Sequence, residues 1–134
     1  MSLLSEPVKL SIQTTKRAEA IDITAKVEAG LPKLEVGSGI NIWVPHTTAG
    51  VTVNEAADPA VMADLISQLE EFIPWENNYR HREGNSAAHV KSVLLDWHQW
   101  IPVKNNSLGL GRWQGIFFME WDGPRNRTCY IYPD

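Results

Sequence analysis

The chain has 134 residues, the length of one domain, and its 43% apolar and 21% charged residues are typical of a globular protein that needs no disulfide or metal to fold. Its single cysteine, Cys129, excludes an intrachain disulfide, and the lack of an export signal or of ~20 consecutive apolar residues favours a cytoplasmic protein with no membrane partner. A net charge of −4 argues against nucleic acid as a partner, because binding the phosphate backbone of a nucleic acid needs a basic surface.

The first half of the chain predicts four strands and one short helix. Alternating apolar and polar side chains, or runs of β-branched residues, indicate strands over residues 8–12, 21–24, 40–44 and 51–53. Apolar residues near helical spacing, cut short by Gly30 and Pro32, predict a helix over residues 24–29.

The next helix has the clearest start in the sequence. Asp58 caps free backbone N–H groups and Pro59 fits the first helical turn, while Pro74 ends the segment. Its expected apolar stripe consists of Val61, Leu65, Leu69 and Phe72.

A polar and aromatic stretch over residues 75–85 predicts a loop, and loops often carry binding or catalytic residues. Residues 86–95 predict a further helix that Ser86 caps. Pro102 predicts an edge strand, since proline cannot donate to a ladder. The remaining strands are expected over residues 100–103, 114–121 and 128–132.

This order of elements predicts the α+β class. We expect a single domain, residues 1–134, built on a largely antiparallel, β-sandwich-like sheet with two or three helices. Six tryptophans are many for this length, and most are expected in the core or in a subunit interface.

A first polar group follows the predicted strand 40–44. Polar side chains at a strand end often line a cleft, and hydroxyl groups suit a phosphate. In the structural alternative, Asp58 caps the helix and its neighbours complete a turn. The group comprises His46, Thr47, Thr48, Asn54, Glu55 and Asp58.

A second group lies in the loop and at the start of the helix after it. It comprises His81, Glu83, Asn85 and His89. Neutral imidazoles are the usual donors to zinc, and a catalytic zinc takes three protein ligands and a water. The eight-residue separation of His81 and His89 is not the spacing of a zinc motif on one helix face, so packing of His89 against the sheet is the alternative.

A third group is rich in arginine and comprises Arg112, Gln114, Arg125 and Arg127. Arg125 and Arg127 share a face if the turn before them opens directly into a strand, and two guanidinium groups suit a phosphate or carboxylate. In the alternative, Asp122 pairs with Arg127 within a hairpin. Together the three groups predict a pocket for a small phosphorylated molecule.

These groups also carry a resemblance to a known family. The motifs that carry it are HTTAG at residues 46–50, GNSAAH at 84–89, LGRWQ at 110–114 and EWDGPRNR at 120–127. With these motifs in this order, the chain resembles the YjbQ-like (secondary thiamine-phosphate synthase) family over residues 8–133. It departs from the family pattern at residues 96–100 and at Arg112.

The resemblance implies an α+β fold, a homotrimer, and a pocket at the subunit interface. It implies a transferase that joins a pyrimidine pyrophosphate to a thiazole phosphate and releases pyrophosphate, with Mg²⁺ or Zn²⁺ and no organic cofactor. The expected catalytic residues are His46, His89 and Glu55. The expected substrate-binding residues are Thr47, Thr48, Asn54, Asn85, Arg112, Gln114, Arg125 and Arg127. The expected metal ligands are His46, His81, His89 and Asp58.

Two other functions fit the same residues. One is a zinc-dependent hydrolase of a small substrate, with His46, His81 and His89 around the metal. The other is a trimeric metabolite-binding protein without catalytic activity, which would use the same pocket.

Overall fold

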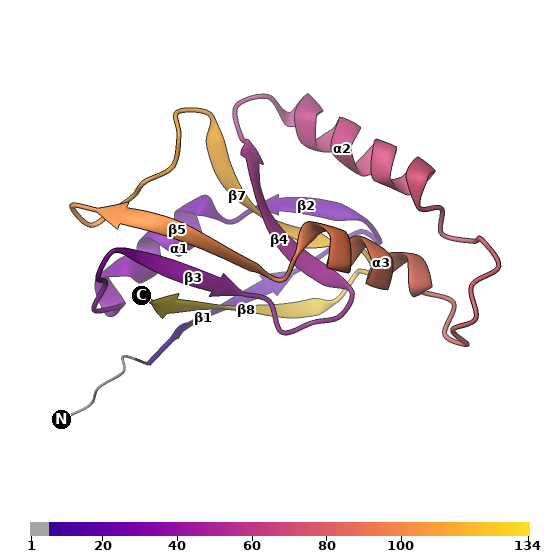
Figure 1. Ribbon diagram of the computed structural model, residues 1–134, viewed down its shortest axis with the longest axis horizontal. Coiled ribbons are helices and arrows are strands. Elements are labelled where there is room, and N and C mark those ends of the chain that lie inside the picture. Colours follow the sequence, from indigo (N-terminus) through magenta and orange to yellow (C-terminus); the bar gives the residue numbers. More distant parts are fainter. Residues whose placement is uncertain (1–5) are drawn as a thin grey trace.

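Two antiparallel sheets and three α-helices make up residues 6–134, the part of the chain that the computed structural model describes (Figure 1). Residues 1–5 of the predicted domain lie outside it. In chain order the elements are β1 (Val8–Gln13), β2 (Glu19–Asp22), α1 (Thr24–Gly30), the 3₁₀ turn η1 (Leu31–Lys33), β3 (Gly39–Trp43), β4 (Ala49–Glu55), α2 (Pro59–Phe72), α3 (Ser86–Leu95), β5 (His98–Lys104), β6 (Ser107–Leu108), β7 (Gln114–Glu120) and β8 (Asn126–Pro133). The predicted α+β class is confirmed.

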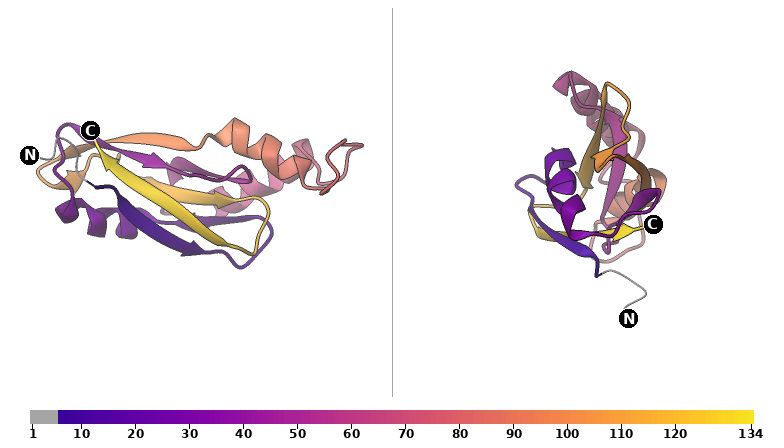
Figure 2. Two further views of the ribbon diagram at one scale, coloured as in Figure 1. Left: turned by 90° about the horizontal axis from the view of Figure 1, so that it is seen from below. Right: turned by 90° about the vertical axis from the view of Figure 1, so that its left-hand side faces the viewer.

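The larger sheet has the strand order β1-β8-β3-β5-β6, and the smaller sheet has the order β2-β7-β4. Buried residues of both sheets belong to one core cluster, so the sheets pack face to face. The molecule is elongated, with α1 near one end and the loop before α3 at the other (Figure 2).

Residues 115–121, in and just after β7, are apolar almost throughout because both faces of this strand are covered. Ile116 and Phe118 belong to the core between the sheets, whereas Phe117, Met119 and Trp121 belong to a second cluster beneath α2 and α3. Side chains alternate along a strand, so a central strand covered on both faces needs apolar residues at every position.

Helix α2 begins where the sequence predicts, since Asp58 Oδ1 accepts a hydrogen bond from the N–H of Ala60 (2.9 Å). Its packed stripe differs from the prediction. Met62 is buried, while Phe72 is 74% exposed. The buried stripe starts one residue later than expected, and the other residues that pack in it are Leu65, Ile66 and Leu69.

One expectation about α3 was wrong. Asn85 rather than Ser86 precedes the first turn of α3. Strand β5 spans His98–Lys104, and the short β6 pairs only with its last two residues, so Pro102 has a ladder partner on the β3 side alone, as its edge position predicted. Asn105 and Asn106, both with positive φ, form a turn between β5 and β6. The short strand β6 itself was not predicted.

The chain leaves α3 through a tight crossing over β4. Asp96 has φ 77° and ψ 156°, and its carbonyl accepts the N–H of Val51 (3.0 Å). A Cβ at Gly50 would lie 2.6 Å from that carbonyl oxygen, so only glycine allows the approach. This contact fixes α3, which carries part of the site, against the sheet.

The tryptophans divide between the core and the surface of the chain. Of the six, Trp121 alone is fully buried, and Trp43, Trp100 and Trp113 are 45%, 45% and 56% exposed. None of the helices in residues 6–134 is long and apolar enough to cross a membrane.

Candidate functional site

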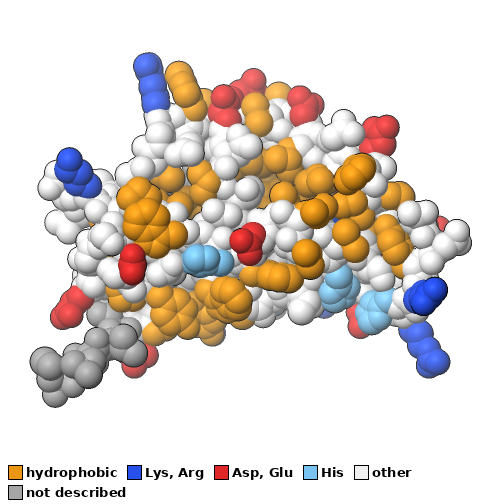
Figure 3. Space-filling model, viewed as in Figure 1, with side chains coloured by type: hydrophobic (Ala, Val, Ile, Leu, Met, Phe, Trp, Pro, Cys, Tyr) orange, Lys and Arg blue, Asp and Glu red, His pale blue; other side chains and the backbone are white. Residues whose placement is uncertain are grey.

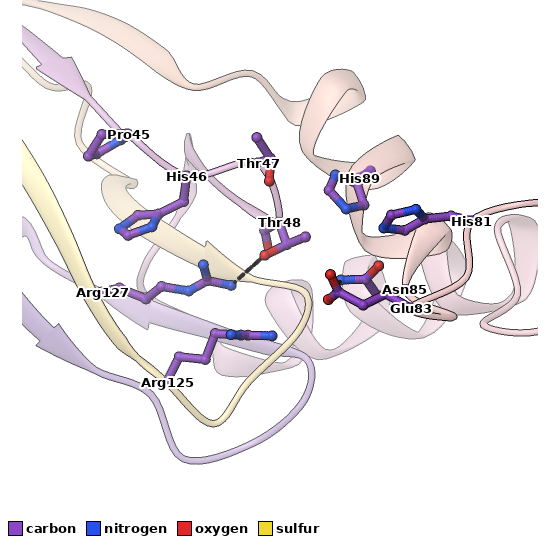
Figure 4. A pocket seen from close by; sticks show the side chains of 10 residues that line it. All are labelled: Pro45, His46, Thr47, Thr48, His81, Glu83, Asn85, His89, Arg125 and Arg127. Atoms are coloured by element: carbon purple, nitrogen blue, oxygen red, sulfur yellow. Dashed lines mark hydrogen bonds between the residues drawn. The ribbon is translucent and has the colours of Figure 1, made fainter.

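A hollow of about 500 Å³ opens where three segments meet (Figure 4). They are the turn between β3 and β4, the start of β8 with the turn before it, and the loop that leads into α3. The lining residues are Pro45, His46, Thr47, Thr48, His81, Glu83, Asn85, His89, Arg125 and Arg127. The structure thus brings members of all three predicted groups together, and this hollow is the candidate site.

His46 is held by the backbone of the neighbouring strand. The β3–β8 ladder ends with Trp43 opposite Tyr130, and beyond it the N–H of Thr128 donates to His46 Nε2 (2.9 Å). Because a backbone N–H can only donate, Nε2 is the acceptor of the ring, and a neutral ring carries its proton on Nδ1.

The surroundings of His46 keep it neutral. Burial, followed by the nearby charge of Arg127, lowers the pKa of His46 below its ordinary value of 6.5. A neutral ring whose Nε2 is occupied can offer a ligand its Nδ1–H. This arrangement suits a hydrogen-bond donor better than a general base, which needs an accessible lone pair.

Arg127 is buried and lies against buried Glu120, which accepts from both Nε (2.8 Å) and an NH2 group of the guanidinium. The same guanidinium donates to Thr48 Oγ1 (2.8 Å) and to the Thr48 carbonyl (3.2 Å). Thr14 Oγ1 donates to Glu120 Oε1 (2.7 Å), which also accepts from Arg127 Nε. The network joins the two sheets at the floor of the pocket.

Arg125 has a different setting. Its side chain is 49% exposed, and its guanidinium donates to the Asp122 carbonyl (2.7 Å) and to Asp122 Oδ2 (3.0 Å). The suggested pairing of Asp122 with Arg127 is therefore wrong: Asp122 binds Arg125, and Arg127 binds Glu120. Arg125 reaches into the pocket from the turn and is its most accessible cationic group.

Asn85 bridges two acidic residues at the other wall. Its Nδ2 donates to Glu83 Oε2 (3.1 Å) and to Asp122 Oδ2 (2.8 Å). Its Oδ1 is buried and has no hydrogen-bond partner among residues 6–134.

His81 and His89 lie edge to face, with ring centroids 5.4 Å apart. In Figure 4 they occupy one side of the pocket, and His46 lies on the other. Asp58 caps α2 and does not line the pocket. No group of three or more His, Cys, Asp or Glu in residues 6–134 is placed to share a metal ion. One chain therefore supplies an imidazole pair but not the four-residue metal site predicted from the sequence.

Four predicted substrate-binding or catalytic residues lie elsewhere in the chain. Glu55 faces Gln114 and Asn54 faces Gly115 where β4 pairs with the start of β7. Thr48 precedes β4 and Glu55 ends it, and a seven-residue strand carries the chain about 20 Å. The four residues outside the pocket are Asn54, Glu55, Arg112 and Gln114.

Glu120 and Thr14 shape the site although the sequence analysis gave neither a role. A carboxylate inside an otherwise apolar strand was the available signal for Glu120, since such a group needs a buried partner. Thr14 had no comparable signal, because its contact spans 106 residues of sequence.

Comparison with known proteins agrees with the motifs. The family model described as UPF0047 protein YjbQ-like matches residues 8–132. The chain belongs to the YjbQ/UPF0047 family. UPF0047 protein YugU of Bacillus subtilis is 54% identical to it over 91% of this chain and 94% of its own length. UPF0047 protein MJ1081 of Methanocaldococcus jannaschii is 49% identical over 92% of this chain and 90% of its own.

Solved structures of the family share the fold of this UPF0047 chain. A YjbQ/UPF0047-family protein from Clostridium acetobutylicum matches with a TM-score of 0.88 at 42% identity, over 92% of this chain and 97% of that one. A conserved hypothetical protein from Thermus thermophilus matches with a TM-score of 0.85 at 43% identity, over the same shares.

The pocket of this UPF0047 chain therefore offers three kinds of chemistry. Arg125, Thr47 and His46 Nδ1–H can donate hydrogen bonds to an anion. Glu83 and Asn85 Oδ1 can accept hydrogen bonds. The His81–His89 pair can transfer protons or contribute to metal binding.

Proposed function

We propose that this UPF0047 chain is an enzyme of the thiamine-phosphate synthase type, which joins a pyrimidine pyrophosphate to a thiazole phosphate and releases pyrophosphate. One observation carries the proposal. The accessible guanidinium of Arg125 shares a hollow of about 500 Å³ with the histidine pair and with the donors of the β3–β4 turn. That combination supports binding and reaction of a small phosphorylated molecule.

The proposed roles follow from the contacts. Arg125 would bind the departing pyrophosphate, whose negative charge grows as its bond breaks. Arg127, already paired with Glu120, would mainly hold Thr48 and the pocket floor. His89 is the proposed acid–base group, and His46 would donate from Nδ1.

Mg²⁺ would enter with the pyrophosphate of the substrate. Among the described residues of one chain, no group of three or more His, Cys, Asp or Glu is placed to share a metal ion. Glu55 and Asp58 could serve the pocket only from a neighbouring subunit, because they lie outside it in their own chain.

We also propose a homotrimer as the active form. Hydrophobic side chains cover much of the face that carries α3, β3 and β5 (Figure 3). Exposed large apolar residues on these elements are Trp43, Val90, Val93, Leu94 and Trp100. Single apolar residues are ordinary on a surface, but a cluster of this kind supports a protein interface.

A zinc-dependent hydrolase is the second candidate, and the His81–His89 pair is the observation that favours it. Metal analysis of untagged protein separates the two proposals. Stoichiometric zinc that is lost in the His89→Ala variant would favour hydrolysis, and protein without zinc would count against it.

The proposed activity is tested by titrating thiazole phosphate, pyrimidine pyrophosphate and pyrophosphate, each with and without Mg²⁺, and then by assaying for thiamine phosphate. Saturable binding with product formation would support the synthase. Binding without turnover would support the third possibility, a trimeric metabolite-binding protein. Absence of binding by all three compounds would contradict the phosphate pocket itself.

A further inference from the structure

We infer that the hollow binds a diphosphate at two points: an outer one at Arg125, and an inner one formed by Arg127 Nη1 and the Nδ1–H of His46. The inference rests on the proposed function, because it assigns the diphosphate of the proposed substrate to particular atoms of the same pocket. A ligand with one phosphate keeps more of its water at the exposed Arg125 and would use the outer point alone.

Both arginines hold their carboxylate partners with the same edge of the guanidinium. Arg127 donates to Glu120 from Nε and Nη2, and its Nη2 also donates to Thr48. Arg125 donates to Asp122 from Nε and Nη2. Nη1 of each arginine has no hydrogen-bond partner among residues 6–134. Since Nη1 carries N–H donors of its own, each arginine keeps them for an anion that approaches from another side.

The free nitrogen of Arg127 can be reached from the hollow although the side chain is only 5% exposed. Some side-chain nitrogen and oxygen atoms of residues 6–134 are fully buried and have no partner, but neither Arg127 Nη1 nor His46 Nδ1 is one of them. Both atoms lack a partner, so both must have accessible surface, and both residues line the hollow. In Figure 4 one terminal nitrogen of Arg127 is bonded to Thr48, and the other points toward the turn that carries His46.

The inner point combines a charged donor with a neutral one. His46 Nε2 accepts the N–H of Thr128, which leaves Nδ1–H as the free donor of the ring. Burial, and after it the charge of Arg127, lowers the pKa of His46, so the ring lies within the field of the guanidinium. Donors in a largely buried setting are strong when paired and costly when unpaired, so they favour an anionic oxygen.

The outer and inner points are adjacent. Arg125 and Arg127 are two residues apart where β8 begins, so in an extended chain they leave the same face with Cα atoms about 7 Å apart. Their ion pairs are also connected, since the N–H of Asp122 donates to Glu120 Oε2 (3.1 Å). Two separate phosphates at neighbouring points would repel each other, whereas a covalent link between them makes the second contact intramolecular. Two phosphoryl groups joined by one oxygen fit this arrangement.

A matched pair of stable probes tests the inference. Methylenediphosphonate has two phosphonate groups on one carbon, and methylphosphonate has one. We would titrate each without metal ions at pH 7.5 and follow the ¹⁵N signal of His46 Nδ1 in the wild-type protein. Methylenediphosphonate should bind roughly tenfold more tightly, as expected for added hydrogen bonds between charged groups. It should also shift the Nδ1 signal, which methylphosphonate at Arg125 should leave nearly unchanged.

A charge-neutral double variant separates the inner point from general electrostatic attraction. Glu120→Leu/Arg127→Met removes the inner guanidinium, leaves no buried charge behind and keeps the net charge of the chain. The preference for methylenediphosphonate should fall to about twofold, with the affinity for methylphosphonate little changed. Arg112→Met is the control and should keep the preference, because Arg112 stacks on Trp113 outside the hollow. If the double variant does not fold, the His46 signal of the wild-type protein decides.

Equal binding of the two probes by the wild-type protein would overturn the inference and leave the phosphate pocket standing. A preference that survives in the double variant, or a His46 signal that methylenediphosphonate does not move, would also overturn it, because the second phosphonate would then interact elsewhere. Binding of neither probe, nor of pyrophosphate, would overturn both the inference and the proposed function.

Discussion

The guanidinium of Arg127 and the carboxylate of Glu120 form an ion pair inside the fold, with side-chain exposures of 5% and 0%. Arg127 belongs to β8 in one sheet and Glu120 to β7 in the other. Thr48 and Thr14 satisfy further donors and acceptors of the pair. The pair therefore connects the two sheets directly below the candidate site.

Removing one partner of this pair should destabilise the protein more than removing both. Glu120→Gln leaves the Arg127 charge buried without a counter-ion, and we expect the free energy of unfolding in urea to fall by about 3 kcal/mol. The double variant Glu120→Leu/Arg127→Met should lose less, because no buried charge remains. Exposed Glu28→Gln serves as the control. A single variant as stable as the wild type would contradict this role.

His46 should make the protein sensitive to mild acid. Burial and the charge of Arg127 lower its pKa in the folded state, so below the ordinary value of 6.5 the unfolded chain binds a proton that the folded chain does not. The stabilisation from neutral His46 is complete above pH 6.5 and is lost as the pH falls through the folded-state pKa. Urea titrations at pH 7.5 and 5.5 should show a smaller acid loss for His46→Gln than for the wild type.

The control for this prediction is exposed His98, whose Nε2 contacts Asn41 Oδ1 (2.7 Å) away from the pocket. His98→Gln should keep the acid loss of the wild type. The tautomer of His46 is a second readout, since its Nε2 must be the unprotonated nitrogen at pH 7.5 in ¹⁵N spectra. A proton on Nε2 would contradict the contact with Thr128.

The fold was predictable where the local chemistry is decisive. Asp58 and Pro59 mark the start of α2 because capping depends only on adjacent residues. Leu65 and Leu69 of α2 pack as predicted, but Met62 is buried in place of Val61 and Phe72 is exposed, because only the position of the sheet decides which apolar residues of the helix it covers. Which apolar residues of α2 are buried depends on tertiary packing, and the sequence pattern does not contain that information.

The candidate site was predictable in part for a related reason. Residues that approach the pocket from different segments, such as His46, His89 and Arg125, do converge. Glu55 and Gln114 converge with one another instead, because β4 leads away from the pocket and β7 leads back toward it. Motif order along the chain does not reveal which end of a strand faces a site.

Asp96 should be replaceable by glycine with a gain in stability. Its φ of 77° and ψ of 156° lie in a region that essentially only glycine adopts without strain, and such strain costs about 1–3 kcal/mol. Asp96→Gly loses a hydrogen bond from the N–H of Trp97 (2.7 Å), so we expect a net gain of about 1 kcal/mol in the free energy of unfolding. Asn78→Gly is the comparison, because asparagine tolerates its φ of 55° and little should change. A less stable Asp96→Gly variant would show that the side chain is needed.

Glu70 joins three parts of the structure through two cations. Lys91 in α3 is fully buried with Nζ 3.0 Å from Glu70 Oε1, and Arg17 lies 2.6 Å from Glu70 Oε2. Burial alone would raise the pKa of Glu70, but the hydrogen bonds and charges of Arg17 and Lys91 together lower it. Its stabilising effect is thus present above its ordinary pKa of 4.5 and is lost as the pH falls through the lowered value.

Because the Lys91 ammonium is buried, removing its partner Glu70 should destabilise the protein more than removing Lys91 itself. Glu70→Gln leaves the ammonium buried without a carboxylate and should lower the free energy of unfolding by about 3 kcal/mol. Lys91→Met keeps the apolar stem that packs near Trp121 and removes the charge, so it should cost clearly less. Urea unfolding at pH 7 measures both, with exposed Glu71→Gln as the matched control on the same helix. A larger loss for Lys91→Met than for Glu70→Gln would mean that Lys91 stabilises α3 by contacts other than the ion pair.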